Sequence, residues 1–137
     1  MSSFKIFDIA GSGMNAQNLR LNVVSSNLAN VDAVSSSMEE TYRARQPVFR
    51  AMLDKLNQDA PAVGVSMAAV VESKAPLVRE YAPDHAMADG DGYIYRPNVN
   101  AVEEMANMIS ASRSYQNNVE VLNSARQMMI STINMGR

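Results

Sequence analysis

The chain has 137 residues, 47% of them hydrophobic, so it can bury a core and is not compositionally disordered. Its 12 basic and 14 acidic residues give a net charge of −2, which provides neither the basic surface that binds nucleic acid nor a polybasic membrane patch. It has no cysteine, which excludes disulfides, and its longest apolar run, MAAVV at 67–71, is far too short to span a bilayer.

A seven-residue spacing predicts a long helix from the first residues to residue 31. Two columns of mostly apolar residues, three positions apart, recur at this interval: Phe7, Met14, Leu21 and Leu28, and Ala10, Gln17, Val24 and Val31. Such columns are typical of a coiled-coil seam, in which Gln17 is the one polar member. Gly11 and Gly13 weaken the first turns of this helix.

Residues 38–97 have a different pattern, which predicts a small antiparallel β unit with irregular segments. Alternating residues at 63–71 indicate one strand, and PLVREYAP at 76–83 indicates a second. In ADGDGYIYRP, Asp-Gly turns precede Tyr93 and Tyr95, which would share one face of a strand. The segments SSSMEE at 35–40 and LNQDAP at 56–61 are expected to be loops.

A second long helix is predicted at 101–134. Asn100 stands three residues before Glu103, an Asn variant of the capping box. The seam predicted for this helix is more polar than the first. Its columns are Val102, Ile109, Gln116, Asn123 and Ile130, and Met105, Ser112, Val119, Arg126 and Ile133.

We therefore expect a mainly α fold with a small β insert, in which the long N- and C-terminal helices pair as a coiled-coil-like hairpin. Residues 1–37 and 98–137 would form a helical assembly domain, and 38–97 a β-rich outer segment. A helix of about 33 residues is about 50 Å long. A compact globule of this size is only about 37 Å across, so the helices should project from it and need partners.

Each terminal helix also carries a second apolar face. In the first helix it consists of Ile9, Ala16, Leu19 and Val23, and in the second of Met108, Tyr115, Leu122 and Met129. One antiparallel partner covers only one face of a helix. We therefore expect the second faces to be covered by helices of other molecules, which makes assembly the leading hypothesis.

Two amides, Asn27 and Asn30, lie near the end of the first helix among mostly apolar neighbours. Asn tolerates the left-handed conformation that ends helices and can bond freed backbone groups, so Asn30 is expected to end the helix. A buried amide needs hydrogen-bond partners, and we expect Asn27 to bond the backbone of a neighbouring subunit. The alternative is that both amides are simply solvated.

No group of residues predicts catalysis, a metal site or a cofactor site. His85, beside Asp84 in a Pro-flanked loop, is interpreted as exposed. The DGDG segment at 89–92 lacks two ligands of a calcium loop, because Met87 and Asn98 stand where Asp and Glu are needed. A hairpin turn is the expected structure there, and the protein is not expected to be an enzyme.

The segment LNVVSSNLANVDAV at 21–34 resembles the N-terminal signature of flagellar basal-body rod and hook proteins, whose core reads N-L-A-N. YRARQPVF, DGYIYRPNVN and MISASRSYQNNVEVLNSARQMM resemble, in order, the proximal rod proteins of that family. The resemblance implies a structural subunit of the torque-transmitting rod in the periplasm. Implied partners are copies of itself, other proximal and distal rod proteins, the basal-body adapter and the flagellar type III export apparatus, with no cleaved signal peptide.

The expected assembly interface combines seam positions with amides and the extra apolar column: Phe7, Met14, Leu21, Val24, Asn27, Leu28, Asn30, Val102, Met105, Ile109, Tyr115, Val119, Leu122, Met129 and Ile133. FRAML at 49–53 resembles a short Phe-x-x-x-aliphatic export element, with Phe49 and Leu53 as its members. The alternative function is a cytoplasmic coiled-coil adaptor or export chaperone. Recovery with basal bodies distinguishes the two.

Overall fold

The computed structural model describes residues 3–53 and 63–136. Its elements, in chain order, are α1 (Ser3–Ala29), β1 (Arg45–Leu53), β2 (Val63–Glu72), β3 (Val78–Tyr81), β4 (Tyr93–Arg96) and α2 (Ala101–Met135). The strands form two antiparallel sheets, β1–β2 and β3–β4. The predicted mainly α fold with a small β insert is therefore confirmed, whereas the loop expected at 56–61 lies outside the described residues.

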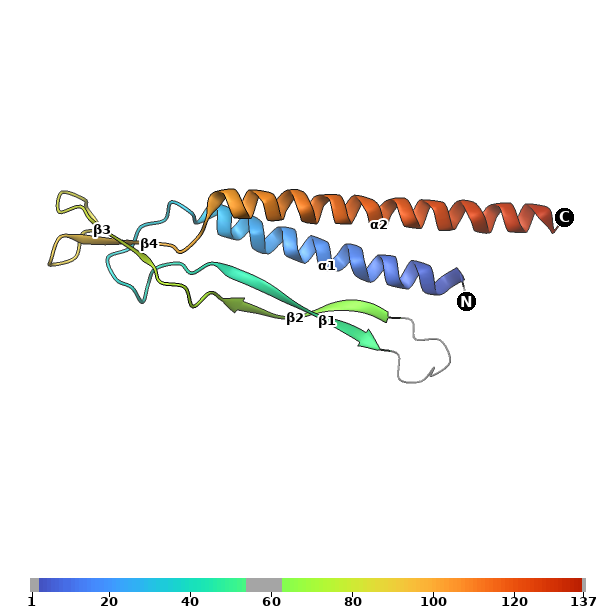
Figure 1. Cartoon of the computed structure of the whole chain (residues 1–137), viewed down its shortest axis with the longest axis horizontal. Helices are drawn as coiled ribbons and strands as arrows, with labels where there is room; N and C mark the ends of the chain where they lie inside the picture. The colour runs from blue at the N-terminus through green and yellow to red at the C-terminus, as the bar shows by residue number, and fades with distance from the viewer. Residues whose placement is uncertain (1–2, 54–62, 137) are drawn as a thin grey trace.

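The molecule is elongated, with α1 and α2 side by side and running in opposite directions (Figure 1). The β1–β2 hairpin follows the other side of α1, and the β3–β4 sheet forms the end of the molecule away from the two termini. Helix α1 thus lies between α2 and the hairpin and contacts both of them. Within residues 3–53 and 63–136, neither helix meets the length and hydropathy that a membrane span requires.

The two helices meet through small side chains. Ala10 and Val24 of α1 and Ala111 and Ala125 of α2 are buried. A Cβ atom added at Gly13 would lie 3.0 Å from the side-chain nitrogen of Asn118, so this glycine permits a close approach of the helices. Ala10 and Val24 belong to one predicted column of α1, whose last member, Val31, lies beyond the end of the helix at Ala29.

The seam predicted for α2 does not face α1. Val102 is 75% exposed, Met105 54% and Ile109 56%. The contact is made instead by a column of mostly small or polar residues at the same seven-residue interval, Glu104, Ala111, Asn118 and Ala125. The prediction was wrong because it ranked columns by hydrophobicity, whereas helices that pack closely need small residues at the contact.

The second apolar face of α1 is covered in part by the chain's own hairpin. The hydroxyl of Ser12 accepts a hydrogen bond from the Val65 amide of β2 at 3.1 Å, and Ala16 is buried. The expectation that only another molecule could cover this face is therefore wrong for α1. The β1–β2 hairpin, with about nine residues in each strand, can lie along α1 because the hairpin and the helix are both straight and of similar length.

Both sheets are short antiparallel hairpins. In the first, Arg45 pairs with Glu72 at one end and Leu53 with Val63 at the other, with a bulge between Val48 and Phe49. Strands β2, β3 and β4 match the predicted segments. The sequence pattern did not single out β1, because RQPVFRAML has no regular alternation and contains a proline.

The start of α2 is confirmed as predicted. Asn100 has an extended backbone, and its side chain accepts hydrogen bonds from the amides of Val102 and Glu103. These are two of the amides that the first turn of a helix leaves without partners. The cap therefore fixes the point at which the chain turns from the β region into α2.

Replacing Ala111 by Leu should lower the free energy of unfolding by about 1–3 kcal/mol, because a larger side chain overpacks the contact between α1 and α2. Thermal or urea unfolding followed by circular dichroism measures this change. Ala106→Leu, on the exposed side of the same helix, is the matched control and should change stability little. Equal stability of the two variants would contradict the assigned contact.

Candidate functional site: an amide joint between helix and hairpin

Asn27 lies in the last turns of α1, and its side chain is completely buried. Both the oxygen and the nitrogen of its side-chain amide form hydrogen bonds. Its Oδ1 accepts hydrogen bonds from the Arg45 amide at 2.9 Å and from the Tyr42 hydroxyl at 2.8 Å. Its Nδ2 donates to the Arg45 carbonyl at 2.8 Å. The side chain thus pairs with the first residue of β1 as a neighbouring strand would. The backbone it binds is its own, so the expected bond to another subunit is wrong.

Asn30 ends α1 with its side chain rather than through a left-handed backbone. Its Nδ2 donates at 2.8 Å to the Ser26 carbonyl, which also accepts a hydrogen bond from the Asn30 backbone amide at 3.3 Å. No residue other than glycine has a positive φ in the described parts of the chain, so the expected left-handed conformation is wrong. The side chain therefore reinforces a carbonyl that already has a backbone partner, and the predicted capping of freed backbone groups is wrong.

Asn98, between β4 and α2, is a second bridging amide. Its Oδ1 accepts from the Ala44 amide at 2.8 Å, and its Nδ2 donates to the Ala75 carbonyl at 2.8 Å. The Ser73 amide donates to the Ala44 carbonyl at 2.7 Å, which joins the same segments. The end of α1 and the segment before α2 are thus both connected to the start of the hairpin. We call the residues that make this connection the amide joint: Asn27, Tyr42, Ala44, Arg45 and Asn98.

Asn98 and Tyr42 are members of this site that the sequence patterns do not predict. In the sequence, Asn98 stands out only as the position where a calcium loop would need an acidic ligand. Its signal in the sequence is weak, because any polar residue between a strand and a helix cap has the same local context. Its partners, at Ala44 and Ala75, are 54 and 23 residues away along the chain.

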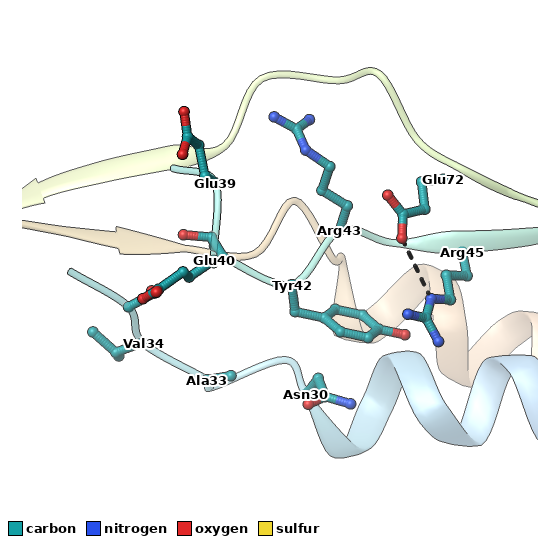
Figure 2. A pocket seen from close by; sticks show the side chains of 11 residues that line it. Asn30, Ala33, Val34, Glu39, Glu40, Tyr42, Arg43, Arg45 and Glu72 are labelled. Carbon is teal, nitrogen blue, oxygen red and sulfur yellow. Dashed lines mark ion pairs between the residues drawn. The ribbon is translucent and has the colours of Figure 1, made fainter. Parts of the chain in front are cut away.

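A polar pocket of about 540 Å³ opens beside the joint. Figure 2 shows Glu39 and Glu40 on one side, and Arg45 paired with Glu72 on the other. The Arg45 and Glu72 side chains are 3.7 Å apart and both are substantially exposed, so the pair contributes little to stability. In the described part of the chain, no group of three or more His, Asp or Glu residues could hold a metal ion.

Asp89 organises the turn before β4. Its carboxylate accepts hydrogen bonds from the amides of Asp91 and Tyr93 and from the Tyr95 hydroxyl. The Tyr93 amide is the largest cause that holds the pKa of Asp89 below its usual value, and Asp89 in turn raises the pKa of Tyr95. Gly92 has a φ of 81°, which the turn requires. The predicted turn is confirmed.

The remaining predicted interface residues fall into two groups. Most are half-buried along α1 or on the inner side of α2: Phe7, Met14, Leu21, Leu28, Val119, Leu122 and Met129. Val102, Met105, Ile109, Tyr115 and Ile133 are exposed. Phe49 and Leu53 lie in β1, and His85 is exposed as expected. Whether these residues contact neighbours or act in export stays a prediction.

Two family models match the chain at its two ends. "Flagella basal body rod protein" matches residues 7–35 and "Flagellar basal body rod FlgEFG protein C-terminal" matches residues 91–135. The sequence is 48% identical to the flagellar basal-body rod protein FlgC of Salmonella typhimurium and 44% identical to that of Yersinia enterocolitica. Each alignment spans 137 residues and covers the whole of this chain and the whole of the relative. The FlgC of Borreliella burgdorferi is 35% identical over 97% of each chain.

The chain belongs to the FlgC family of flagellar basal-body rod proteins. The resemblance found in the sequence is thereby confirmed, and FlgC proteins are structural subunits of the basal-body rod. The alternative, a cytoplasmic adaptor or chaperone, has no support. The two matched segments contain Asn27 and Asn98, so both bridging amides of the joint lie in the parts that the rod family shares.

Replacing Asn27 by Ala should lower the free energy of unfolding by several kcal/mol. It leaves the Arg45 amide and the Arg45 carbonyl without this partner, and each unpaired buried group costs about 1–3 kcal/mol. The Tyr42 hydroxyl loses one bond and keeps its contact with the Ser26 hydroxyl at 3.2 Å. Asn22→Ala, on the exposed side of α1, should change stability by less than about 0.5 kcal/mol. Denaturation of the two variants by urea compares them, and similar midpoints would contradict the assigned role of Asn27.

The turn at Asp89 should weaken in acid. Because the folded pKa of Asp89 lies below its ordinary value of 3.8, the charged carboxylate stabilises the turn fully above that pH. The stabilisation is lost as the pH falls through the lower, folded pKa. The NMR shift of the Tyr93 amide should titrate with a midpoint below 3.8, and this titration should be lost in Asp89→Asn. A midpoint at or above 3.8 would exclude these hydrogen bonds in solution.

Proposed function

We propose that the chain assembles into the rod through its terminal helices, with copies of itself and with other proximal and distal rod proteins as neighbours. The supporting observation is the outward side of α2, where Val102, Met105 and Ile109 are more than half exposed. Large apolar side chains gathered on one side of a helix indicate an interaction surface. A helix of 35 residues that packs on one side only has room for a further helix on the other.

We also propose that α1 and α2 pair as a coiled-coil-like hairpin. Within the chain, small residues bring α1 and α2 together, and this leaves the larger apolar residues of α2 free for neighbours. The half-buried residues Phe7, Met14 and Leu21 lie along one edge of α1. Packing against a neighbouring helix would complete their burial and supply the stability that a one-sided helix lacks.

Transmission of torque requires that the parts of each subunit do not rotate against one another. The amide joint supports this role, because it fixes the start of β1 to α1 through three hydrogen bonds of Asn27 and to the start of α2 through Asn98. In this proposal, residues 1–37 and 98–137 form the helical assembly domain. Residues 38–97 form the outer segment, part of which is bound to α1.

The remaining partners follow from family membership. We infer that the basal-body adapter contacts the chain in the rod and that the subunit crosses to the periplasm through the flagellar type III export apparatus. Phe49 and Leu53 are the candidate export element. Since both lie in β1 and Phe49 is half-buried, the apparatus would read them in the unfolded chain.

Ile109→Asp should abolish recovery of the subunit in purified basal bodies and abolish motility. Ile109 is exposed in the single chain, so the variant should fold, but an interface would bury the new carboxylate at a cost of several kcal/mol. Gln116→Asp, seven residues later on the same column, is the matched control and should assemble. Swarming assays and immunoblots of basal bodies measure both. Full motility of Ile109→Asp, with normal helix content, would refute the proposed surface.

A further inference from the structure

Glu104, in the first turn of α2, is a buried carboxylate for which the described residues supply no partner. It is 9% exposed, and its Oε2 is enclosed without a hydrogen bond to any described residue. None of the ion pairs within residues 3–53 and 63–136 involves it. The amides of Val102 and Glu103, which would otherwise be available to a carboxylate here, donate to Asn100. A buried charge without a partner costs free energy, so a cation from outside the chain would stabilise this site.

Glu104 lines a pocket of about 390 Å³ at the place where α1, β1 and the start of α2 meet, here called the Glu104 pocket. One part of its wall is apolar and consists of Val24, Pro47 and Phe49. The other part is polar and consists of Arg20, Arg45, Gln46, Glu103, Glu104 and Asn107. The second oxygen of Glu104, Oε1, is not among the enclosed atoms that lack a partner, so an incoming group can reach the carboxylate there.

The two arginines of the Glu104 pocket already have partners. Arg20 donates to a side-chain amide oxygen of α2 at 3.0 Å, and Arg45 lies 3.7 Å from Glu72 (Figure 2). The charge of Glu72 offsets that of Arg45. Within the pocket, Glu103 and Glu104 then stand against Arg20 alone, so the two negative charges exceed the one positive charge by one. A single incoming cation would neutralise the pocket.

The composition of the wall matches an arginine side chain. The methylene groups of arginine pack against apolar surface, which Val24 and Pro47 provide, while its charged end stays among polar groups. A guanidinium group also stacks on an aromatic ring such as that of Phe49 and binds a carboxylate through two parallel N–H donors. Lysine has no planar group that could do both at once.

Resting on the proposed assembly into the rod, we propose that the Glu104 pocket receives an arginine side chain of a neighbouring protein. The occupant belongs to a protein other than this chain, because the chain has a net charge of −2 and its acidic pocket is complementary to a basic surface. Without the arginine, the buried charge of Glu104 destabilises the fold. With the arginine, the same charge becomes half of an ion pair, so Glu104 has opposite effects on the free chain and on assembly.

Glu104→Gln tests these opposite effects, because it removes the charge and keeps the shape of the side chain. In the free chain, the variant should unfold at a higher urea concentration than the natural protein, as followed by circular dichroism. Its recovery in purified basal bodies should fall about tenfold, the effect of losing a hydrogen bond to a charged group. Glu120→Gln, at an exposed position of the same helix, is the matched control and should change neither measurement.

Two results of this experiment would contradict the proposed role of the pocket. A urea midpoint that does not rise in Glu104→Gln would mean that the carboxylate has a partner within the chain. A higher midpoint with undiminished recovery would mean that no cation binds Glu104 in the rod. Absence of the natural subunit from basal bodies would instead refute the proposed function.

A small probe measures the chemical preference of the Glu104 pocket in the free chain. N-acetyl-arginine amide carries the guanidinium as its only charge, and N-acetyl-citrulline amide has nearly the same shape without the charge. In amide NMR spectra, the arginine compound should give saturable shifts at Gln46, Phe49 and Glu104, and these shifts should be lost in Glu104→Gln. Equal shifts with the citrulline compound, or no saturable shifts with either, would refute an arginine site.

Photo-cross-linking in basal bodies identifies the occupant. A benzophenone amino acid replaces the exposed Gln46 or, in a second variant, the exposed Ala106 beside Glu103. Each should give a cross-link to a protein of different mass, in a peptide that contains an arginine. A cross-link to a second copy of this chain would overturn the proposed occupant. Basal bodies that contain the labelled subunits but give no cross-link would refute the docking and leave the proposed function intact.

Discussion

The arrangement of the whole chain depends on one buried amide. Asn27 satisfies both the donor and the acceptor of the first residue of β1, and a polar group buried so deeply is stable only with all its partners. Since the same residue lies in the last turns of α1, the direction of the hairpin is set by the direction of the helix. Asn98 adds the start of α2 to this connection. These amides join the three elements at the end where the packing of α1 against α2 and against the hairpin begins.

The sequence predicted those features that depend on neighbours along the chain. The heptad spacing predicted both helices, and Asn100 predicted the start of α2. Alternating residues and turn residues predicted the three strands β2, β3 and β4. The burial of Asn27 was foreseen only as a need for partners, because an amide at a helix end does not reveal which backbone it will bind. The contact between Asn98 and Ala44 spans 54 residues and has no local signal.

The error in α2 has a more general cause. Heptad analysis finds the most hydrophobic side of a helix, and in a single globular chain that side is usually buried within the chain. Here the chain buries a side of α2 with small residues such as Ala111 and leaves Val102 and Ile109 outside. In a subunit of an assembly, the most apolar side of a helix can belong to the contact with other subunits, so the heptad columns identify a surface without telling which molecule covers it.

The joint also determines where this sequence can change. Asn27 binds the amide and the carbonyl of residue 45, and Asn98 binds the amide of residue 44. These groups are present in every amino acid except proline, which lacks the amide hydrogen. Position 45 can therefore accept other side chains, because the Arg45 side chain is half exposed. Proline is the exception, because it has no amide hydrogen to donate to Asn27. The restriction falls on the two asparagines, because no other side chain offers a donor and an acceptor at the same length.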